Sequence, residues 1–179
     1  MLIAGQLMAS ARVAPAPGER PVGWAPPMAP NAQGQGGEGP DSLQERRLAL
    51  VREHMRSENE HRFEDALATF DHPRYELIAT GEVYDGPAEV ASYYSTSRAA
   101  FPDQRNENVV LHQAADAVIA EFDLLGTMEG ELRGIEPTGR SFRCRMCALF
   151  LFEAGGTRIV CERIYFDQAT IARQLLEGH

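Results

Sequence analysis

The stretch from residue 142 to 167, FRCRMCALFLFEAGGTRIVCERIYFD, decides the fold. Its two apolar and aromatic runs, at 142–153 and 158–167, predict strands, and the Gly155-Gly156 pair between them is a turn signal. The preceding sequence adds three more predicted strands, at 108–113, 117–126 and 129–134. The second half of the chain is therefore expected to form a long antiparallel meander.

The sequence from Ser42 to about residue 101 predicts mainly helices. Ser42 and Glu45 form an S-x-x-E capping box, in which each side chain satisfies a backbone donor, so a helix is expected from there to about residue 58. A second short helix is predicted at 63–70, two short extended pieces at 75–79 and 82–84, and a third helix from Pro87 to Phe101. A short helix at 170–176 closes the chain. Helices followed by a meander predict an α+β fold, with three N-terminal helices packed on a curved antiparallel sheet.

The composition divides the chain into a leader and one domain. Residues 1–40 hold seven of the eleven prolines, with few charges and no apolar periodicity, so we expect residues 1–41 to be a disordered Pro/Gly-rich leader. The domain is then expected at 42–179. No run of apolar residues is long enough to cross a bilayer, and no membrane partner is expected.

Charge and cysteine usage exclude several function classes. The formal net charge of −9 repels phosphate backbones, so nucleic acid is not an expected partner. All 17 basic residues are arginine, which excludes Schiff-base chemistry and a P-loop lysine. The three cysteines are odd in number and lie among apolar residues, which favours a reduced, cytoplasmic setting. Cys144 and Cys147 make a C-x-x-C, but in a strand they would point to opposite faces, which argues against a metal or redox pair.

Short motifs in a fixed order carry a family resemblance. They are TGEVYDG at 80–86, Phe101-Pro102-Asp103, Gly126-Thr127 with Gly130, Pro137-Thr138-Gly139-Arg140, and Gln174-Leu175. With these motifs the chain resembles the SnoaL-like polyketide and ester cyclases of the nuclear-transport-factor-two-like superfamily. The resemblance implies a cystatin-like cone with a cavity open at one end, a homodimer formed through the sheet, and no cofactor.

The same resemblance tests whether cyclase chemistry can be transferred. The cyclases' catalytic aspartate corresponds to Ile164, their assisting histidine falls near Cys147, and a histidine common in ester-cyclase relatives is replaced by Met128. Isoleucine cannot transfer a proton. The fold and the pocket are therefore expected to carry over, and the aldol mechanism is not.

Glu162 is the nearest acid to the substituted aspartate position. If Ile164 faces the cavity, the two-residue period of a strand places Glu162 and Phe166 on the same face. A carboxylate in an apolar cone has its pKa raised by desolvation toward a useful range for a base. The alternative is a structural ion pair between Glu162 and Arg145 or Arg143 on the neighbouring strand.

Two histidines and two tyrosines complete the candidate site. His54 lies on the apolar face of the first helix and is either a cavity residue or a hydrogen-bonded core histidine; His72 is either catalytic or a helix C-terminal cap. Tyr75 and Tyr94 could donate hydrogen bonds to a ligand oxygen or serve as core residues. No two histidines have the spacing of a zinc site, so no metal is expected.

Two functions remain open from the sequence. The first is an enzyme acting by acid–base chemistry on a small apolar carbonyl or ester compound, with Glu162, His54 and His72 as candidate proton carriers. The candidate ligand-binding residues are Tyr75, Tyr94, Met128, Arg145, Cys147, Ile164 and Phe166. The second function is a non-catalytic module of the same fold that binds a hydrophobic ligand or dimerises.

Overall fold

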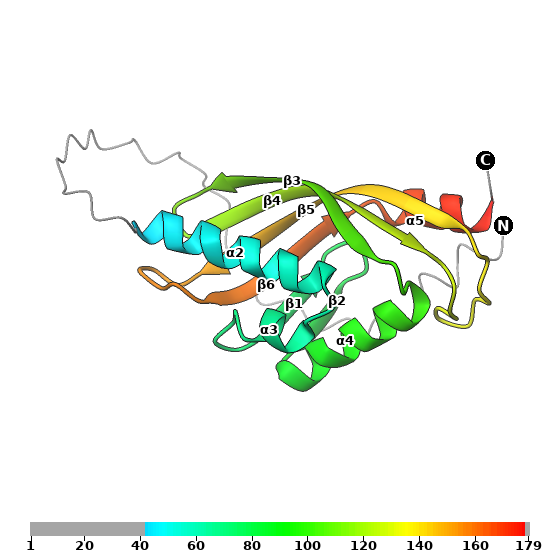
Figure 1. Ribbon diagram of the computed structural model, residues 1–179, viewed down its shortest axis with the longest axis horizontal. Coiled ribbons are helices and arrows are strands. Elements are labelled where there is room, and N and C mark those ends of the chain that lie inside the picture. Colours follow the sequence, from blue (N-terminus) through cyan, green and yellow to red (C-terminus); the bar gives the residue numbers. More distant parts are fainter. Residues whose placement is uncertain (1–41, 178–179) are drawn as a thin grey trace, which may run out of the picture.

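The computed structural model describes residues 42–177, so the predicted leader at 1–41 lies outside the described residues. Figure 1 shows helices on one side of a curved sheet and the C-terminal helix at its far end. The elements, in chain order, are α2 (Leu43–Asn59), α3 (Phe63–Leu67), β1 (Arg74–Leu77), β2 (Glu82–Asp85), α4 (Pro87–Ala100), β3 (Arg105–Gln113), β4 (Ala117–Thr127), β5 (Ser141–Phe152), β6 (Ile159–Phe166) and α5 (Gln168–Leu176). This is the predicted α+β arrangement.

The six strands form one sheet in the order β2-β1-β6-β5-β4-β3. All neighbours are antiparallel except β1 and β6, which run parallel. The meander from β3 to β6 was predicted from the sequence, and the short hairpin of β1 and β2 extends it at one edge. The parallel pairing sets Tyr75 beside Glu162 and Leu77 beside Ile164, a register that shapes the site described below.

Two predicted helix-start signals are confirmed. Ser42 caps α2 with both halves of the capping box in place, and Pro87 occupies the first turn of α4. At α5 the cap is Asp167, whose carboxylate accepts from the backbone N–H of Thr170. These local contacts satisfy backbone donors that a helix start leaves free.

The predicted strand at 129–134 is wrong. Its backbone is hydrogen-bonded to the end of α4: the N–H groups of Glu129 and Gly130 both donate to the Ala100 carbonyl. A tight turn follows, with φ of 54° at Arg133 and 80° at Gly134. The segment is therefore a loop folded against α4, and it covers one end of the sheet.

The core lies between the helices and the inward face of the sheet. Along β5 the inward side chains are all buried, namely Phe142, Cys144, Met146, Ala148, Phe150 and Phe152. The side chains between them, such as Arg143 and Arg145, face outward. Cys144 and Cys147 therefore lie on opposite faces, as predicted, and all three cysteines are free. None of the described helices is long and apolar enough to cross a membrane.

Candidate functional site

A cavity of about 580 Å³ opens between α4, α5, the 128–135 loop and the inward face of the sheet. Its walls are mainly apolar and include Phe142, Met146 and Leu175. Three of the predicted ligand-binding residues, Met128, Ile164 and Phe166, also line it. This volume suits a small organic molecule, because ligand pockets commonly span roughly 300–1,000 Å³.

A few polar groups lie along the cavity wall. Arg133 from the 128–135 loop forms an ion pair with Glu82 of β2, and both residues line the cavity. On another part of the wall, the Ser97 hydroxyl donates to the Gln104 side-chain carbonyl at 2.7 Å. The cavity is thus an apolar chamber with a charged pair linking two of its walls.

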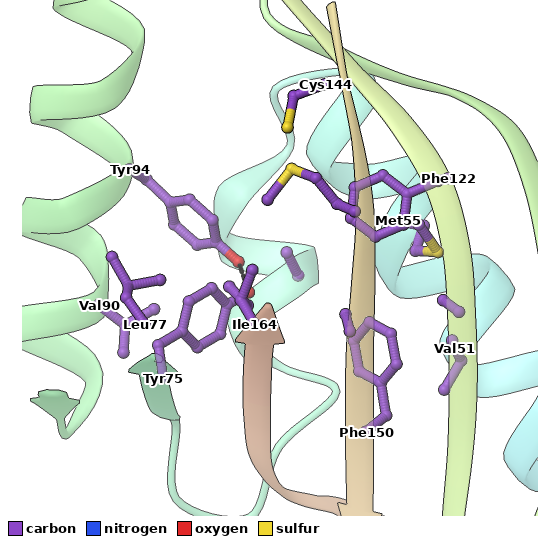
Figure 2. Close-up of a cluster of buried hydrophobic side chains, with 14 of the residues drawn as sticks. Val51, Met55, Tyr75, Leu77, Val90, Tyr94, Phe122, Cys144, Phe150 and Ile164 are labelled. Atoms are coloured by element: carbon purple, nitrogen blue, oxygen red, sulfur yellow. Dashed lines mark hydrogen bonds between the residues drawn. The ribbon is translucent and has the colours of Figure 1, made fainter. Parts of the chain in front are cut away.

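Behind this cavity lies a buried acid–base cluster made of His54, Glu58, Tyr75, Tyr94 and Glu162. His54 Nε2 lies 3.3 Å from Glu162 Oε2 and 3.6 Å from Glu58 Oε1. The Tyr75 hydroxyl is 3.0 Å from the same nitrogen and donates to Glu58 Oε1 at 3.1 Å. Tyr75 and Tyr94 share a hydrogen bond between their hydroxyls, which Figure 2 shows beside Ile164. Four elements, α2, β1, α4 and β6, therefore converge on one group of polar atoms.

The other ring nitrogen of His54 fixes how the imidazole is oriented. Nδ1 lies 2.9 Å from the Thr69 hydroxyl and 3.3 Å from the Ala66 carbonyl. Because the Thr69 hydroxyl donates to the Ala66 carbonyl at 2.6 Å, it accepts from His54, which assigns a proton to Nδ1. Nε2 is then the nitrogen that exchanges a proton with the two carboxylates.

Burial and charge set the protonation of this cluster. Burial alone would lower the pKa of His54, but the neighbouring Glu58 and Glu162 carboxylates outweigh it and raise that pKa to about 10. Burial would raise the pKa of Glu58, yet the charge of His54 holds it below its usual range. At Glu162 burial dominates, supported by repulsion from Glu58, so its pKa is raised. The cluster therefore favours an ionised Glu58, a protonated His54 and a Glu162 that holds its proton more tightly than a free carboxyl.

Glu162 also has an unfilled hydrogen-bonding position. Its side chain is almost fully buried, and within residues 42–177 its Oε2 atom has no aligned hydrogen-bond partner despite the 3.3 Å approach of His54. A buried carboxylate oxygen without a partner costs free energy. Such a position is where a proton, a ligand atom or an ion would be stabilised most.

The register of β1 and β6 fixes how the cavity and the cluster adjoin. Glu162 and Ile164 both point inward from β6, and Tyr75 and Leu77 do so from the neighbouring β1. Ile164 and Leu77 line the cavity, whereas Glu162 and Tyr75 occupy the next inward positions along each strand. The cluster therefore lies directly behind an apolar wall formed by these two side chains.

The remaining candidates from the sequence are not brought to this cluster. His72 is two-thirds exposed and pairs with Asp85 at 2.7 Å on the surface. Arg145 and Cys147 lie on the outward face of β5, where Arg145 bonds to Glu121.

The outward position of Arg145 also argues against the alternative interpretation, in which Glu162 forms a structural ion pair with Arg145 or Arg143. Arg143 pairs with Asp123 on the outward face, so neither arginine reaches Glu162, and the partner of that carboxylate is His54. The resemblance placed Cys147 near the cyclases' assisting histidine, but its side chain faces outward, whereas its neighbours Met146 and Ala148 face inward. A shift of one residue exchanges the two faces of a strand.

Sequence reasoning missed Glu58 and Thr69. Glu58 is one helical turn after His54, and this i, i+4 spacing was a usable signal because such pairs face each other on a helix. Thr69 had no local signal, since its contact with His54 depends on how α3 folds back onto α2.

Comparisons with known proteins agree with this architecture. A candidate polyketide cyclase from Xanthomonas campestris superposes with a TM-score of 0.68 at 19% identity, covering 75% of this chain and 99% of the other. AclR, a candidate hydroxylase from Streptomyces galilaeus, superposes with a TM-score of 0.63 at 18% identity, covering 75% of this chain and 83% of AclR. A protein with a ketosteroid isomerase-like fold from Catenulispora acidiphila, bound to trimethylamine, superposes with a TM-score of 0.60 at 16% identity. The superposition covers 70% of this chain and 91% of the other.

At these low sequence identities the structural similarity supports the fold alone. A search of curated proteins finds no match. The family assignment comes from the sequence itself, since the family description of the SnoaL-like polyketide cyclases matches residues 49–175, from within α2 to within α5. That span contains every cavity-lining residue except Leu176 and every member of the buried acid–base cluster, and the chain belongs to the SnoaL-like polyketide cyclase family.

Proposed function

We propose that this protein is an enzyme that binds a small, largely apolar carbonyl or ester compound in the cavity and acts on it by acid–base chemistry. The observation that carries this proposal is the buried contact between Glu162 and His54 directly behind the cavity wall. Glu162 and His54 are the proton carriers, and Tyr75 and Tyr94 are the hydrogen-bond donors. His72 is left out because it lies at the surface.

The chemistry follows from the protonation of the cluster. A general base works best when its pKa is near the working pH, and burial shifts the pKa of Glu162 in that direction. When a proton is removed next to a carbonyl, charge develops on oxygen, and phenolic donors in a dry site stabilise that charge. The short chain from Tyr94 through Tyr75 to Glu58 holds such donors in place.

A substrate reaches the cluster only if the apolar wall opens. Ile164 and Leu77 separate the two spaces, and rotation of these side chains would connect them. Such a gate keeps water away from the carboxylate between turnovers, which strengthens the electrostatic interactions there.

The test is exchange of the protons next to the carbonyl in deuterated buffer, followed by NMR. A panel of small ketones, β-ketoesters and lactones serves as the probe. Glu162→Gln should lower the exchange rate by roughly 100-fold or more, since a positioned acid or base contributes about 10²–10⁴-fold. His72→Gln is the matched control and should leave the rate unchanged. Equal rates for Glu162→Gln and the unaltered protein would remove Glu162 from the mechanism.

A non-catalytic ligand-binding module is the second candidate. It is favoured by the fact that neither Glu162 nor His54, Tyr75 or Tyr94 lines the cavity. In that case a hydrophobic ligand would be retained without exchange, and Glu162→Gln would leave its affinity unchanged. Binding without exchange, across the whole panel, separates this candidate from the enzyme.

The assembly and the domain limits are also proposals. We propose a homodimer through the outward face of the sheet, where Tyr165 is 41% exposed, and a cytoplasmic setting that matches the three free cysteines. Tyr165→Glu should then shift sedimentation from dimer to monomer. We further propose that residues 42–179 fold alone, since α2 starts at its own cap; a chain truncated before Ser42 should keep the unfolding midpoint of the full chain.

A further inference from the structure

Three donor atoms of the buried cluster are spaced like the ligands of a metal ion. His54 Nε2, one oxygen of Glu58 and one oxygen of Glu162 all lie within 4.8 Å of one another, and the two distances from the nitrogen are 3.3 and 3.6 Å. A tetrahedral zinc ion with bonds of about 2.0–2.1 Å holds its nitrogen and oxygen ligands about 3.3 Å apart. The contacts from His54 match that spacing with little adjustment.

Glu162 provides a second, independent observation. Its Oε2 atom is buried and lacks an aligned hydrogen bond from any residue that the structure describes, although it faces His54 Nε2 within the group. Two carboxylates placed this close in a water-excluded site repel each other, and a divalent cation that displaces the proton from His54 Nε2 would neutralise both. The site thus has an unfilled position that suits a positive charge.

The surroundings hold the three ligands in place. The Nδ1–H of His54 donates to Thr69 and approaches the Ala66 carbonyl, which leaves Nε2 directed at the two carboxylates. Metal-binding histidines are commonly oriented in this way by a bond from their other nitrogen. His54 and Glu58 lie one turn apart on α2, and Glu162 lies on an inner strand of the sheet, so all three are on rigid elements.

We propose that His54 Nε2, Glu58 and Glu162 bind one divalent ion of the zinc class. The donor set selects this class, because imidazole with carboxylates suits zinc and its neighbours, whereas magnesium and calcium prefer all-oxygen shells. The Tyr75 hydroxyl, 3.0 Å from His54 Nε2 and 3.1 Å from Glu58, lies near a fourth corner. Binding does not depend on the proposed catalysis. If that catalysis holds, a bound ion silences it, because the ion takes up the nitrogen and oxygens that would carry the proton.

The experiment uses the full chain, freed of metal by a chelator and titrated with Co²⁺ followed by competing Zn²⁺. We expect one ion per chain and the visible bands of four-coordinate Co²⁺, lost again as Zn²⁺ displaces it. Glu58→Gln and Glu162→Gln should each weaken binding by more than about 100-fold, since even outer-shell partners cost about 10–100-fold. Two controls should bind as the unaltered protein does: Glu53→Gln, a surface acid on the same helix, and His72→Gln.

A measurement on the unaltered protein covers the case in which a variant fails to fold. X-ray absorption at the zinc edge should show a shell of nitrogen and oxygen only, without the longer bonds of about 2.3 Å that cysteine sulfur gives. Sulfur in the shell would overturn the proposal. So would retained affinity in folded Glu58→Gln, loss of binding in His72→Gln, or no ion bound at all. Because every readout is binding or spectroscopy, these failures are distinct from a failure of the proposed catalysis.

Discussion

Replacing His54 with Gln should remove a specific part of the protein's pH-dependent stability. In the folded, metal-free chain the pKa of His54 is raised to about 10, whereas an unfolded histidine has a pKa of about 6.5. Below pH 6.5 both states hold the proton, so the ion pairs with Glu58 and Glu162 contribute in full. As pH rises toward 10, the unfolded state has lost its proton and the folded state keeps it, so this contribution falls.

The size of the effect follows from the linkage slope. Each pH unit in this window costs about 1.36 kcal/mol for one group, so from pH 7 to pH 9 the unaltered protein should lose up to about 2.7 kcal/mol relative to His54→Gln. Other groups titrate in the alkaline range, among them Cys161, whose pKa burial raises to about 11. Groups outside the cluster are present in both proteins and cancel in the difference. Glu58 and Glu162 do not cancel, because the His54 charge lowers the pKa of each; in His54→Gln these values rise, which makes about 2.7 kcal/mol an upper bound.

The assay is urea unfolding in the presence of a chelator at several pH values from 6 to 9.5. Glu58→Gln should reduce the dependence of the unfolding free energy on pH, because the Glu58 charge is the main attraction that raises the pKa of His54. His72→Gln is the control, since its exposed pair with Asp85 contributes little. An unfolding free energy of the unaltered protein that does not fall between about pH 7 and pH 9 would refute the reasoning, because it would mean that His54 gains no proton affinity on folding.

Four further substitutions, of which Gly134→Ala is a control, test the fold and the cavity wall, each by the midpoint of thermal or urea unfolding. Gly130→Ala should prevent stable folding, since its added Cβ would lie 2.0 Å from the Ala99 carbonyl oxygen, whereas Gly134→Ala meets open space and should cost only about 1–2 kcal/mol for its positive φ. Arg47→Met should destabilise by about 3 kcal/mol or more, because this buried guanidinium donates to three backbone carbonyls that would lose their partner. Ile164→Ala should cost about 2–5 kcal/mol and, by opening the wall, enlarge the cavity toward the cluster, which larger bound ligands would report.

Most of the architecture could be predicted because its signals are local. The alternating apolar residues of β5 predict a strand, and the capping box at Ser42 predicts a helix start, each from residues only a few positions apart. The strand expected at 129–134 was wrong because Gly130 packs against α4, a contact that only the folded chain creates. The parallel pairing of β1 with β6 likewise joins segments far apart in sequence and has no local signature.

The candidate site could be predicted only as far as strand alternation reaches. Alternation placed Glu162, Ile164 and Phe166 on one face, and the structure has them so. It could not name the partner of Glu162, because His54 lies on a helix more than a hundred residues earlier. Arg145 and Cys147 were expected to contact a ligand, but both face outward, because they alternate with the inward-facing Met146 along β5.

The position of the carboxylate bears directly on how this protein differs from the cyclases it resembles. The resemblance implies an acid at position 164 in the cyclases, whereas the inward-facing acid here is Glu162, two residues earlier along β6 and therefore about 6–7 Å deeper. At that depth Glu162 meets His54 from α2 in place of the cavity. A ligand that fills the cavity touches Ile164 first, so the acid can act on it only through movement of the wall or through the hydroxyls of Tyr75 and Tyr94. The same depth that hinders a substrate favours a small ion, which needs only three converging atoms and no room for a carbon skeleton.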